Sequence, residues 1–185
     1  MEDAISKLAT INGYTTKLGV EDTDKITFHR FRDSKKNVLV VCECDKASKS
    51  ESTLFIRELD GDDNIKAGVI ICEPPKSQGK DVIEAGRKSL PDVTIVTFSP
   101  AQMRTAVSGC IFMPEVVKVI EKAEKMYYNE ELIESDVLAN SPIIKSTDPL
   151  AKLHLMKKGD VMVTKQMNGT TDSVGKKRLC FRVCK

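Results

Sequence analysis

The chain has 185 residues, of which 41% are hydrophobic and 30% charged, and its formal net charge at pH 7 is +2. This length fits one domain or two small ones, and the apolar fraction is sufficient for a packed core and argues against disorder. No run approaches eighteen apolar residues and the acidic N-terminus lacks an apolar signal segment, so we expect neither a membrane-spanning helix nor secretion.

The first 110 residues alternate between helical and strand patterns. We expect helices over 2–12, 49–59, 77–90 and 99–107, and strands over 26–32, 37–44, 67–73 and 93–98. The last three strands are almost continuously apolar, which is typical of strands buried on both faces. Strands alternating with helices predict an α/β fold, with an N-terminal α/β domain over residues 1–110 built on a mixed or parallel sheet.

The rest of the chain is expected to form a connector and a small α+β domain. A stripe of four apolar residues predicts a helix over 114–126, and an acidic run follows this helix. We therefore expect residues 111–139 to form a helix and an acidic connector. Residues 140–185 form the second domain, with strands expected over 161–167 and 177–184.

One stretch of this second domain combines several local signals. Asp148 can cap a helix through its carboxylate, and Pro149 suits the first helical position, where a missing N–H costs nothing. Lys157 and Lys158 suit a helix C-terminus, and Gly159 suits the left-handed residue that ends a helix.

Charge is distributed unevenly between these segments. Residues 140–185 contain ten lysines and arginines against three acidic residues and carry +7, which leaves −5 on residues 1–139. A basic segment joined to a more acidic one indicates that the two ends meet different partners, with an ordinary solvated basic face as the alternative.

The cysteines indicate the cellular compartment. Six are present, and without a secretory signal they indicate reduced thiols and therefore a cytosolic or nuclear protein. Cys42 and Cys44 form one closely spaced pair and Cys180 and Cys184 another, but the pairs lie in different parts of the chain. We therefore expect buried thiols rather than a zinc site.

Catalytic motifs are weak. His29 and His154 lie in different segments, and neither accompanies a nucleophile motif. A metal-dependent nuclease would need acidic residues at the ends of neighbouring strands. Four such residues occur in the N-terminal domain: Glu43, Asp45, Glu73 and Asp92. Because chains turn at strand ends and acidic residues gather there, a nuclease remains an alternative only.

The turn after the strand 67–73 carries positive charge. Lys76 and Ser77 lie in the turn and Lys80 follows them, so this tip could contact nucleic-acid phosphates without reading sequence. A solvated loop is the alternative. Aromatic residues make up only 5% of the chain and tryptophan is absent, so a base-stacking platform is not expected.

Four short motifs occur in order towards the C-terminus. They are Pro142-Ile143, Asp148-Pro149-x-Ala151, Lys158-Gly159-Asp160-Val161 and Phe181-Arg182-Val183. Each is weak alone, but the series resembles the fifth common subunit of eukaryotic nuclear RNA polymerases, whose C-terminal module forms a separate small subunit in archaeal polymerases. Weaker collinear matches, from Gly13-Tyr14 to Met113-Pro114-Glu115, extend the resemblance over nearly the whole chain.

The sequence departs from that family's pattern in four places, among them Leu153 and Leu155, where the family has tyrosine and glycine, and Lys76 before the Pro-Ser turn. The family's H-x-L-V-P-x-H segment becomes Cys110–Val116 and lacks both histidines, and its R-P-S-E-T-A-G segment becomes a longer run between Lys165 and Gly175. A divergent paralogue confined to one polymerase class fits these departures as well as the shared subunit does.

The resemblance implies a non-catalytic subunit of a DNA-directed RNA polymerase, without a cofactor or metal, in the nucleus, or in the nucleolus if confined to RNA polymerase I. Residues 1–110 would be a jaw domain beside downstream double-stranded DNA, approached by Lys76, Ser77 and Lys80. No membrane contact is implied. The alternatives are a stand-alone nucleic-acid-binding protein and a nuclease-like α/β protein.

By the same resemblance, residues 140–185 would be an assembly domain that docks on the largest subunit. Its two strands would offer side chains, or a sheet edge, to the partner, and its basic residues would supply complementary charge. The implied docking residues are Pro142, Ile143, Asp148, Pro149, Ala151, Lys157, Lys158, Gly159, Asp160, Val161, Arg178, Phe181 and Arg182.

Overall fold

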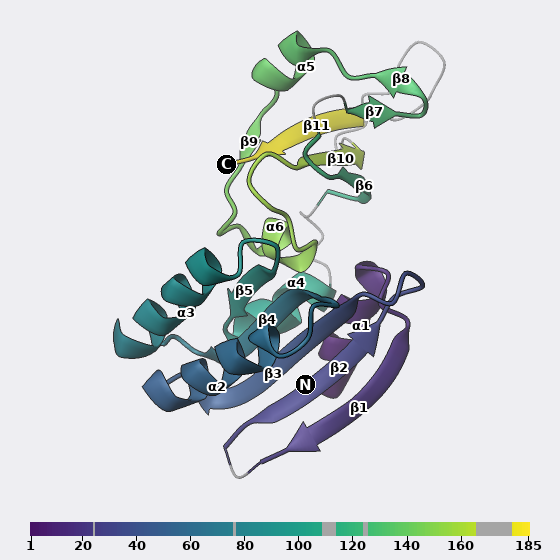
Figure 1. The fold of residues 1–185 in the computed structure, drawn as a ribbon. Helices are drawn as coiled ribbons and strands as arrows, with labels where there is room; N and C mark the ends of the chain where they lie inside the picture. The colour runs from purple at the N-terminus through teal and green to yellow at the C-terminus, as the bar shows by residue number, and fades with distance from the viewer. Residues whose placement is uncertain (24, 76, 109–113, 124–125, 166–178) are drawn as a thin grey trace. The chain divides into compact units, whose positions relative to one another are not determined.

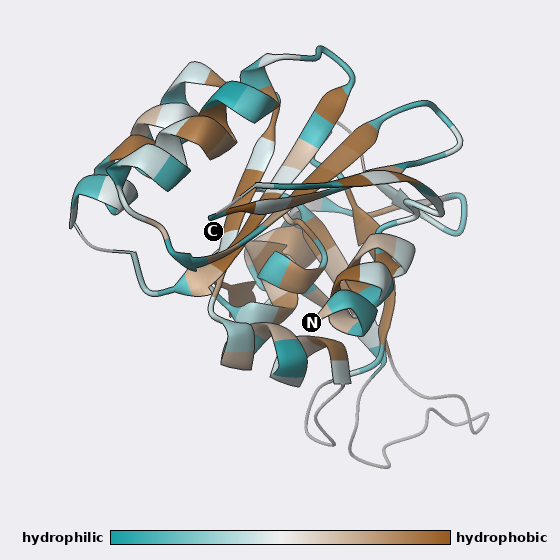
Figure 2. Ribbon diagram, turned by 90° about the horizontal axis from the view of Figure 1, so that it is seen from below, coloured by the Kyte–Doolittle hydropathy of each residue, from teal (hydrophilic) through white to brown (hydrophobic). Residues whose placement is uncertain are grey.

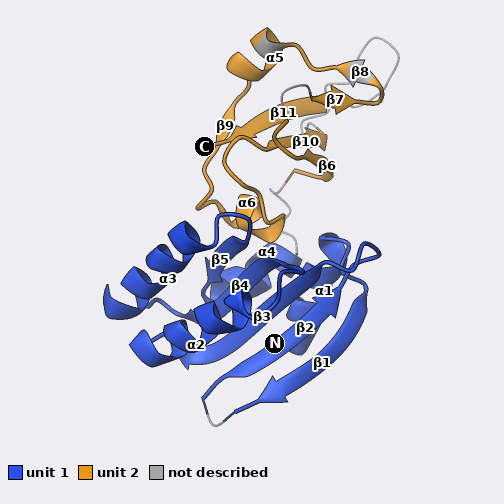
Figure 3. Ribbon diagram, in the orientation of Figure 1, with its two compact units in different colours: residues 1–108 blue, residues 109–185 orange. Residues whose placement is uncertain are grey.

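The computed structural model describes all residues except 24, 76, 109–113, 124–125 and 166–178. The chain divides into two compact units, residues 1–108 and residues 109–185, here called unit 1 and unit 2 (Figure 3). Among the helices of the described ranges, none is long and apolar enough to cross a membrane.

Unit 1 is a three-layer α/β structure around a mixed sheet, as the sequence predicts. The strands lie in the order β1 (Thr16–Asp22), β2 (Thr27–Arg32), β3 (Val38–Lys46), β4 (Ile65–Glu73) and β5 (Thr94–Phe98). The first three strands pair antiparallel, and β3, β4 and β5 pair parallel. Figure 1 shows helices on both faces: α2 (Lys49–Asp60) and α3 (Ser77–Ser89) on one, and α1 (Glu2–Ile11) and α4 (Pro100–Ser108) on the other.

Strand β3 is buried on both faces of this sheet. Val40 belongs to a core cluster with Phe55 of α2 and Ile83 of α3. Leu39 and Val41 point to the opposite face, because side chains alternate along a strand, and they are also 0% exposed. The run of apolar residues in β3 is continuous because helices cover both faces of the sheet. In Figure 2 the central strands are largely brown, the colour of hydrophobic residues.

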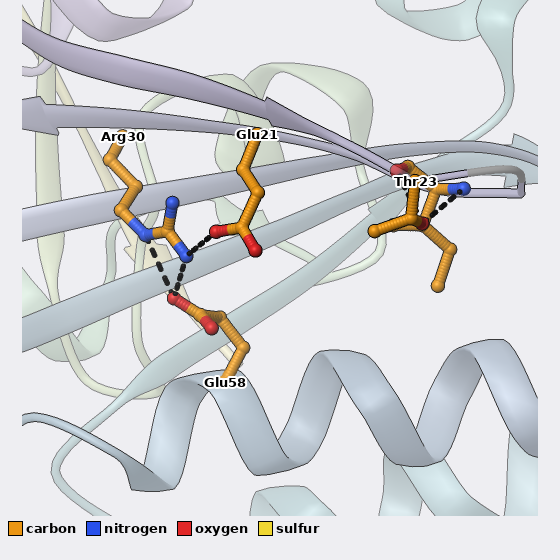
Figure 4. A network of polar contacts seen from close by, with 5 residues as sticks. Glu21, Thr23, Arg30 and Glu58 are labelled. Atoms are coloured by element: carbon orange, nitrogen blue, oxygen red, sulfur yellow. Dashed lines mark hydrogen bonds and ion pairs between the residues drawn. The ribbon is translucent and has the colours of Figure 1, made fainter.

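Strand β1 is an edge strand that the sequence patterns did not reveal. Six of its seven residues are exposed, so no apolar alternation marks it. Polar contacts join it to its neighbours instead (Figure 4). Arg30 of β2 donates from Nη2 to Glu21 of β1 at 2.9 Å and from Nε to Glu58 of α2 at 2.8 Å.

Unit 2 is built on a second, four-stranded sheet. Its strands lie in the order β6 (Val116–Ile120), β10 (Val161–Lys165), β11 (Leu179–Cys184) and β9 (Ile143–Ile144). Pairing is antiparallel except between β11 and β9. The described part also contains β7 (Tyr127–Tyr128), β8 (Glu131–Leu132), α5 (Ser135–Ala139) and α6 (Pro149–Leu153).

Two expectations for unit 2 are wrong. The helix expected over 114–126 is replaced by strand β6, because a run of β-branched valines pairs with β10 and its short apolar stripe suits either periodicity. The helix that starts after Asp148 ends at Leu153 rather than at Gly159. Leu155 (φ 49°) takes the left-handed position after it, and Gly159 (φ 98°) lies in the turn before β10.

The close packing of α3 on the chain before α2 predicts an unusual glycine effect. Replacing glycine by alanine inside a helix ordinarily stabilises it by about 1 kcal/mol. A Cβ at Gly79, however, would lie 2.0 Å from the Ala47 carbonyl oxygen. Gly79→Ala should therefore destabilise the protein, by about 2–4 kcal/mol in urea unfolding.

Gly61→Ala is the matched control. Gly61 has a right-handed backbone, and its Cβ would meet the Glu58 carbonyl oxygen at an ordinary 3.4 Å. Equal unfolding free energies for the two variants would contradict the packing described for α3.

Candidate functional site

The turn before β10 is clamped by the carboxylate of Asp160, which is only 5% exposed. Its Oδ2 accepts a hydrogen bond from the backbone N–H of Lys157 at 2.6 Å. Its Oδ1 accepts one from the backbone N–H of Lys122 at 2.9 Å, from the loop that follows β6. One side chain thus joins two segments that lie 38 residues apart.

The backbone conformation of Gly159 favours glycine in this turn. Its φ of 98° is a conformation that other residues adopt only with strain, whereas the atoms nearest to an added Cβ belong to the flexible, exposed side chain of Lys122. The backbone N–H of Gly159 donates to the Cys184 carbonyl at 2.8 Å, while the Cys184 N–H donates to the Asp160 carbonyl at 2.9 Å. The turn is therefore fixed against the end of β11.

Helix α6 starts as its sequence predicts. Oδ1 of Asp148 accepts from the backbone N–H of Leu150 at 2.8 Å, and Pro149 occupies the first turn. Ala151 on the same helix is 0% exposed. The Asp148-Pro149-x-Ala151 motif therefore encodes a capped and buried helix.

The expected docking residues divide between the surface and the interior of unit 2. Four are exposed: Pro142, Ile143, Lys157 and Lys158. Five are partly exposed: Asp148, Pro149, Gly159, Phe181 and Arg182. Three are buried: Ala151, Asp160 and Val161. Arg178 lies outside the described residues. The buried residues can shape a docking surface but cannot form it.

The expectation that both C-terminal strands offer a sheet edge is wrong for β10. That strand pairs with β6 on one side and β11 on the other, and Val161 to Thr164 are buried. Strand β11 pairs on its far side with β9 through Val183 and Cys184. Phe181, further along β11, packs edge-on against Tyr128 with ring centroids 6.1 Å apart.

The lysine-bearing tip of unit 1 lies where β4 leads into α3. Ser77 is the first residue of α3 and Lys80 lies in its first turn; both are exposed. Lys76 lies outside the described residues. Because Ser77 and Lys80 are exposed, a large ligand can reach both side chains.

A cleft of about 500 Å³ opens in unit 1 beside the ends of β3 and β4. Three of the four acidic residues that the sequence singles out line it: Glu43, Asp45 and Glu73. Asp92 is not among the lining residues. Lys25 and Arg104 also line the cleft and offset part of its negative charge. Within the described ranges, no three His, Cys, Asp or Glu side chains are placed to hold a metal ion together.

His29 is a buried residue beside this cleft whose environment the sequence did not predict. Its Nε2 lies 3.9 Å from Oε2 of Glu43, and neither ring nitrogen has a hydrogen-bond partner among the described residues. Burial lowers the pKa of His29, although Glu43 opposes that shift. A histidine on an alternating strand carries no sequence signal that distinguishes a buried ring from an exposed one.

The cysteines of unit 1 are buried, as expected, and gather on one side of the sheet. Cys42, Cys44 and Cys72 are free thiols. The neighbouring Cys42 thiol, together with burial, raises the pKa of Cys44 to about 12. Its hydrogen bond with Cys44 and its burial raise the pKa of Cys72 as well. The Cys44 and Cys72 thiols therefore stay protonated at neutral pH.

Comparison with known proteins adds no family assignment. No family model matches the chain, and no curated protein matches it. Among solved structures, the chain is similar to one titled "Structure of EndoMS in apo form", with a TM-score of 0.40 and 16% sequence identity. The match covers 54% of this chain and 44% of that one. A similarity of this size carries no functional argument.

The Asp160 clamp can be tested by stability measurements. Asp160→Ala leaves two inward-facing backbone N–H groups without an acceptor and should lower the free energy of unfolding by about 2–4 kcal/mol. Asp148→Ala removes one helix cap and should cost about 1 kcal/mol. Both are measured by urea denaturation, with hydrogen exchange in unit 2 as a local readout. If Asp160→Ala costs no more than Asp148→Ala, the clamp is not a main support of unit 2.

Burial of the histidines predicts a pH dependence. Burial lowers the folded-state pKa of His29 and of His154 below the unfolded value of about 6.5, so the unfolded chain binds protons more readily. The free energy of unfolding should be highest above that pH and should fall as the pH drops through about 6.5 towards the lowered folded-state pKa values. His29→Leu should reduce this fall, as measured by denaturation at several pH values. If the free energy of unfolding of His29→Leu falls with decreasing pH as steeply as that of the wild type, then His29 is not buried in its neutral form.

Proposed function

We propose that the protein is a non-catalytic subunit of a nuclear DNA-directed RNA polymerase. In this proposal unit 2 docks on the largest subunit, and unit 1 lies near downstream DNA. The observation that carries the proposal is that motifs from both ends of the C-terminal segment meet in one sheet. Val183 lies between Val161 on β10 and Ile143 on β9, and its N–H donates to the Pro142 carbonyl at 3.0 Å.

This convergence supports the proposal because the resemblance rests on the series of motifs and not on any one of them. Three motifs supply neighbouring strands, and the fourth supplies the capped helix α6. Residues that are far apart in sequence therefore serve one folded element, as the residues of an assembly module would.

The surface of unit 2 offers an apolar point of contact for a protein partner. Ile143 is 55% exposed on β9, next to the exposed Pro142, and Leu179 at the start of β11 is 39% exposed. Exposed aliphatic side chains on strands suit burial against another chain. Lys157 and Lys158 would add charge at the rim, where it orients association more than it strengthens it.

The role of unit 1 in this proposal rests on its exposed tip. Ser77 and Lys80 would approach the DNA backbone with Lys76, without reading sequence. Lys76→Ala with Lys80→Ala should leave assembly intact and weaken DNA engagement by the assembled enzyme, measured across a salt series. Normal engagement at every salt concentration would remove this assignment.

The docking role is tested by affinity purification of the tagged protein from its own cells, with a high-salt wash and identification of retained proteins by mass. The wild type should retain the two largest polymerase subunits in equal amount. Ile143→Glu should reduce their retention about tenfold or more, because a charge replaces an apolar contact. Elution of the wild type alone would refute the proposal.

Leu54→Glu is the control for that experiment. Leu54 is 50% exposed on α2 of unit 1, so its replacement introduces the same charge at a similar exposure outside the docking unit. It should retain the polymerase subunits as the wild type does. Equal losses for both variants would mean that Ile143 has no specific part in docking.

The second candidate function is that of a stand-alone, nuclease-like α/β protein. The observation that favours it is the cleft that brings together Glu43, Asp45 and Glu73. These carboxylates are not placed to hold a metal ion together in the described structure, so they would have to move towards one another to hold Mg²⁺ or Mn²⁺ and activate water. Calorimetric titration of the full chain with Mn²⁺ tests this function. Binding that is lost in Glu43→Gln and Glu73→Gln would favour it, and the absence of binding would exclude it.

A further inference from the structure

Five exposed lysines surround the Asp160 turn of unit 2. They come from four separate segments of the chain: Lys122, Lys145, Lys157 with Lys158, and Lys185. We call this group the lysine surface. It includes residues from a loop, a strand end and the chain terminus, so no local sequence pattern marks it.

Backbone hydrogen bonds bring these segments together. The Lys122 N–H donates to the Asp160 carboxylate at 2.9 Å, and the Lys157 N–H donates to the same carboxylate at 2.6 Å. The Lys185 N–H donates to the carbonyl of Ile144, the residue before Lys145, at 3.0 Å. The backbones of these segments are therefore held at one end of the sheet, after β6, β9 and β11 and before β10, and the lysines they carry are exposed there.

Four of the five lysines lie in residues 140–185, and the described part of that segment has few carboxylates to offset their charge. The two described side-chain carboxylates of residues 140–185 both accept backbone hydrogen bonds: Asp148 caps α6 and Asp160 clamps the turn. Lys122, Lys145, Lys158 and Lys185 form no ion pair with any residue that the structure describes. Glu121, which is exposed and adjacent to Lys122 in sequence, offsets a part of the charge.

The chemistry of the group favours phosphate over carboxylate as its ligand. All five cations are lysines, which bind phosphate as compact point charges, whereas arginine pairs with carboxylate and phosphate alike through two parallel hydrogen bonds. Lysine is depleted at protein–protein interfaces but is a common contact to nucleic-acid phosphates. The lysine surface contains no aromatic side chain on which a base could stack, so it would not distinguish between bases.

We propose that the lysine surface of unit 2 binds the phosphodiester backbone of a nucleic acid without sequence specificity. This site is separate from the tip of unit 1 and does not depend on the proposed docking role. Lys157 and Lys158 would then face nucleic acid rather than add charge at the rim of the docking contact, and an acidic protein surface is the competing ligand that the experiment distinguishes.

The test uses the full chain and fluorescein-labelled nucleic acids of mixed sequence, one a DNA duplex and one a single-stranded RNA of equal length. Affinity is measured by fluorescence anisotropy over a salt series. The test variant is Lys145→Ala/Lys158→Ala/Lys185→Ala, which spares Lys122 and Lys157, whose backbone N–H groups belong to the clamp. At about 100 mM salt it should bind about tenfold or more weakly, and the slope of log affinity against log salt should fall by about 2–3.

Two further variants control for charge and folding. Lys7→Ala/Lys35→Ala/Lys88→Ala removes the same charge from exposed positions of unit 1 and should bind within about twofold of the wild type, since those lysines lie outside the surface. Lys145→Arg/Lys158→Arg/Lys185→Arg keeps the charge and should bind like the wild type. The relative affinities for duplex DNA and RNA identify which nucleic acid the surface prefers.

Three outcomes would overturn the inference. The first is that the wild type binds neither nucleic acid. The second is that the two alanine variants lose affinity for nucleic acid equally. The third is that the alanine variant of unit 2 keeps its affinity for nucleic acid but no longer co-purifies with large polymerase subunits. The last outcome would assign the surface to an acidic protein partner. Elution of the wild type without polymerase would refute the proposed function and leave this inference standing.

Discussion

The buried carboxylate of Asp160 is the interaction on which unit 2 depends. A carboxylate removed from water is costly unless its oxygens accept hydrogen bonds, and here both do, from the N–H groups of Lys157 and Lys122. These donors come from the turn before β10 and the loop after β6. The same turn bonds to Cys184 at the end of β11, so the clamp sets three strands of the sheet in one arrangement.

This constraint separates residues that shape the unit from residues that can meet a partner. Asp160, Val161 and Ala151 lie inside it, although the motif series would count them with the docking residues. Ile143 and the lysine surface lie outside. The buried residues of a motif therefore stabilise the fold of their own unit. Exposed residues near the motif, and not its buried residues, are the ones that can contact other molecules.

Most of unit 1 could be predicted from sequence because its helices and buried strands carry strong local patterns. Strand β1 could not, since it is exposed and joined through Arg30 rather than through apolar side chains. In unit 2, the helix cap at Asp148 is a local contact and was predicted. The hydrogen bond between the Lys122 N–H and Asp160 joins residues 38 positions apart and was not predicted. The cleft of unit 1 was not predicted, although three of the four acidic residues that the sequence places at strand ends, Glu43, Asp45 and Glu73, line it and Asp92 does not.

The central claim is that unit 2 is an assembly module which docks on the largest subunit of a polymerase. Electron cryo-microscopy of the affinity-purified complex tests it most directly. The account predicts density for residues 140–185 against the largest subunit, with Ile143 in the contact and Asp160 inside the module. An assembly that lacks the chain, or one that holds it through unit 1 while residues 140–185 contact no large subunit, would contradict the claim.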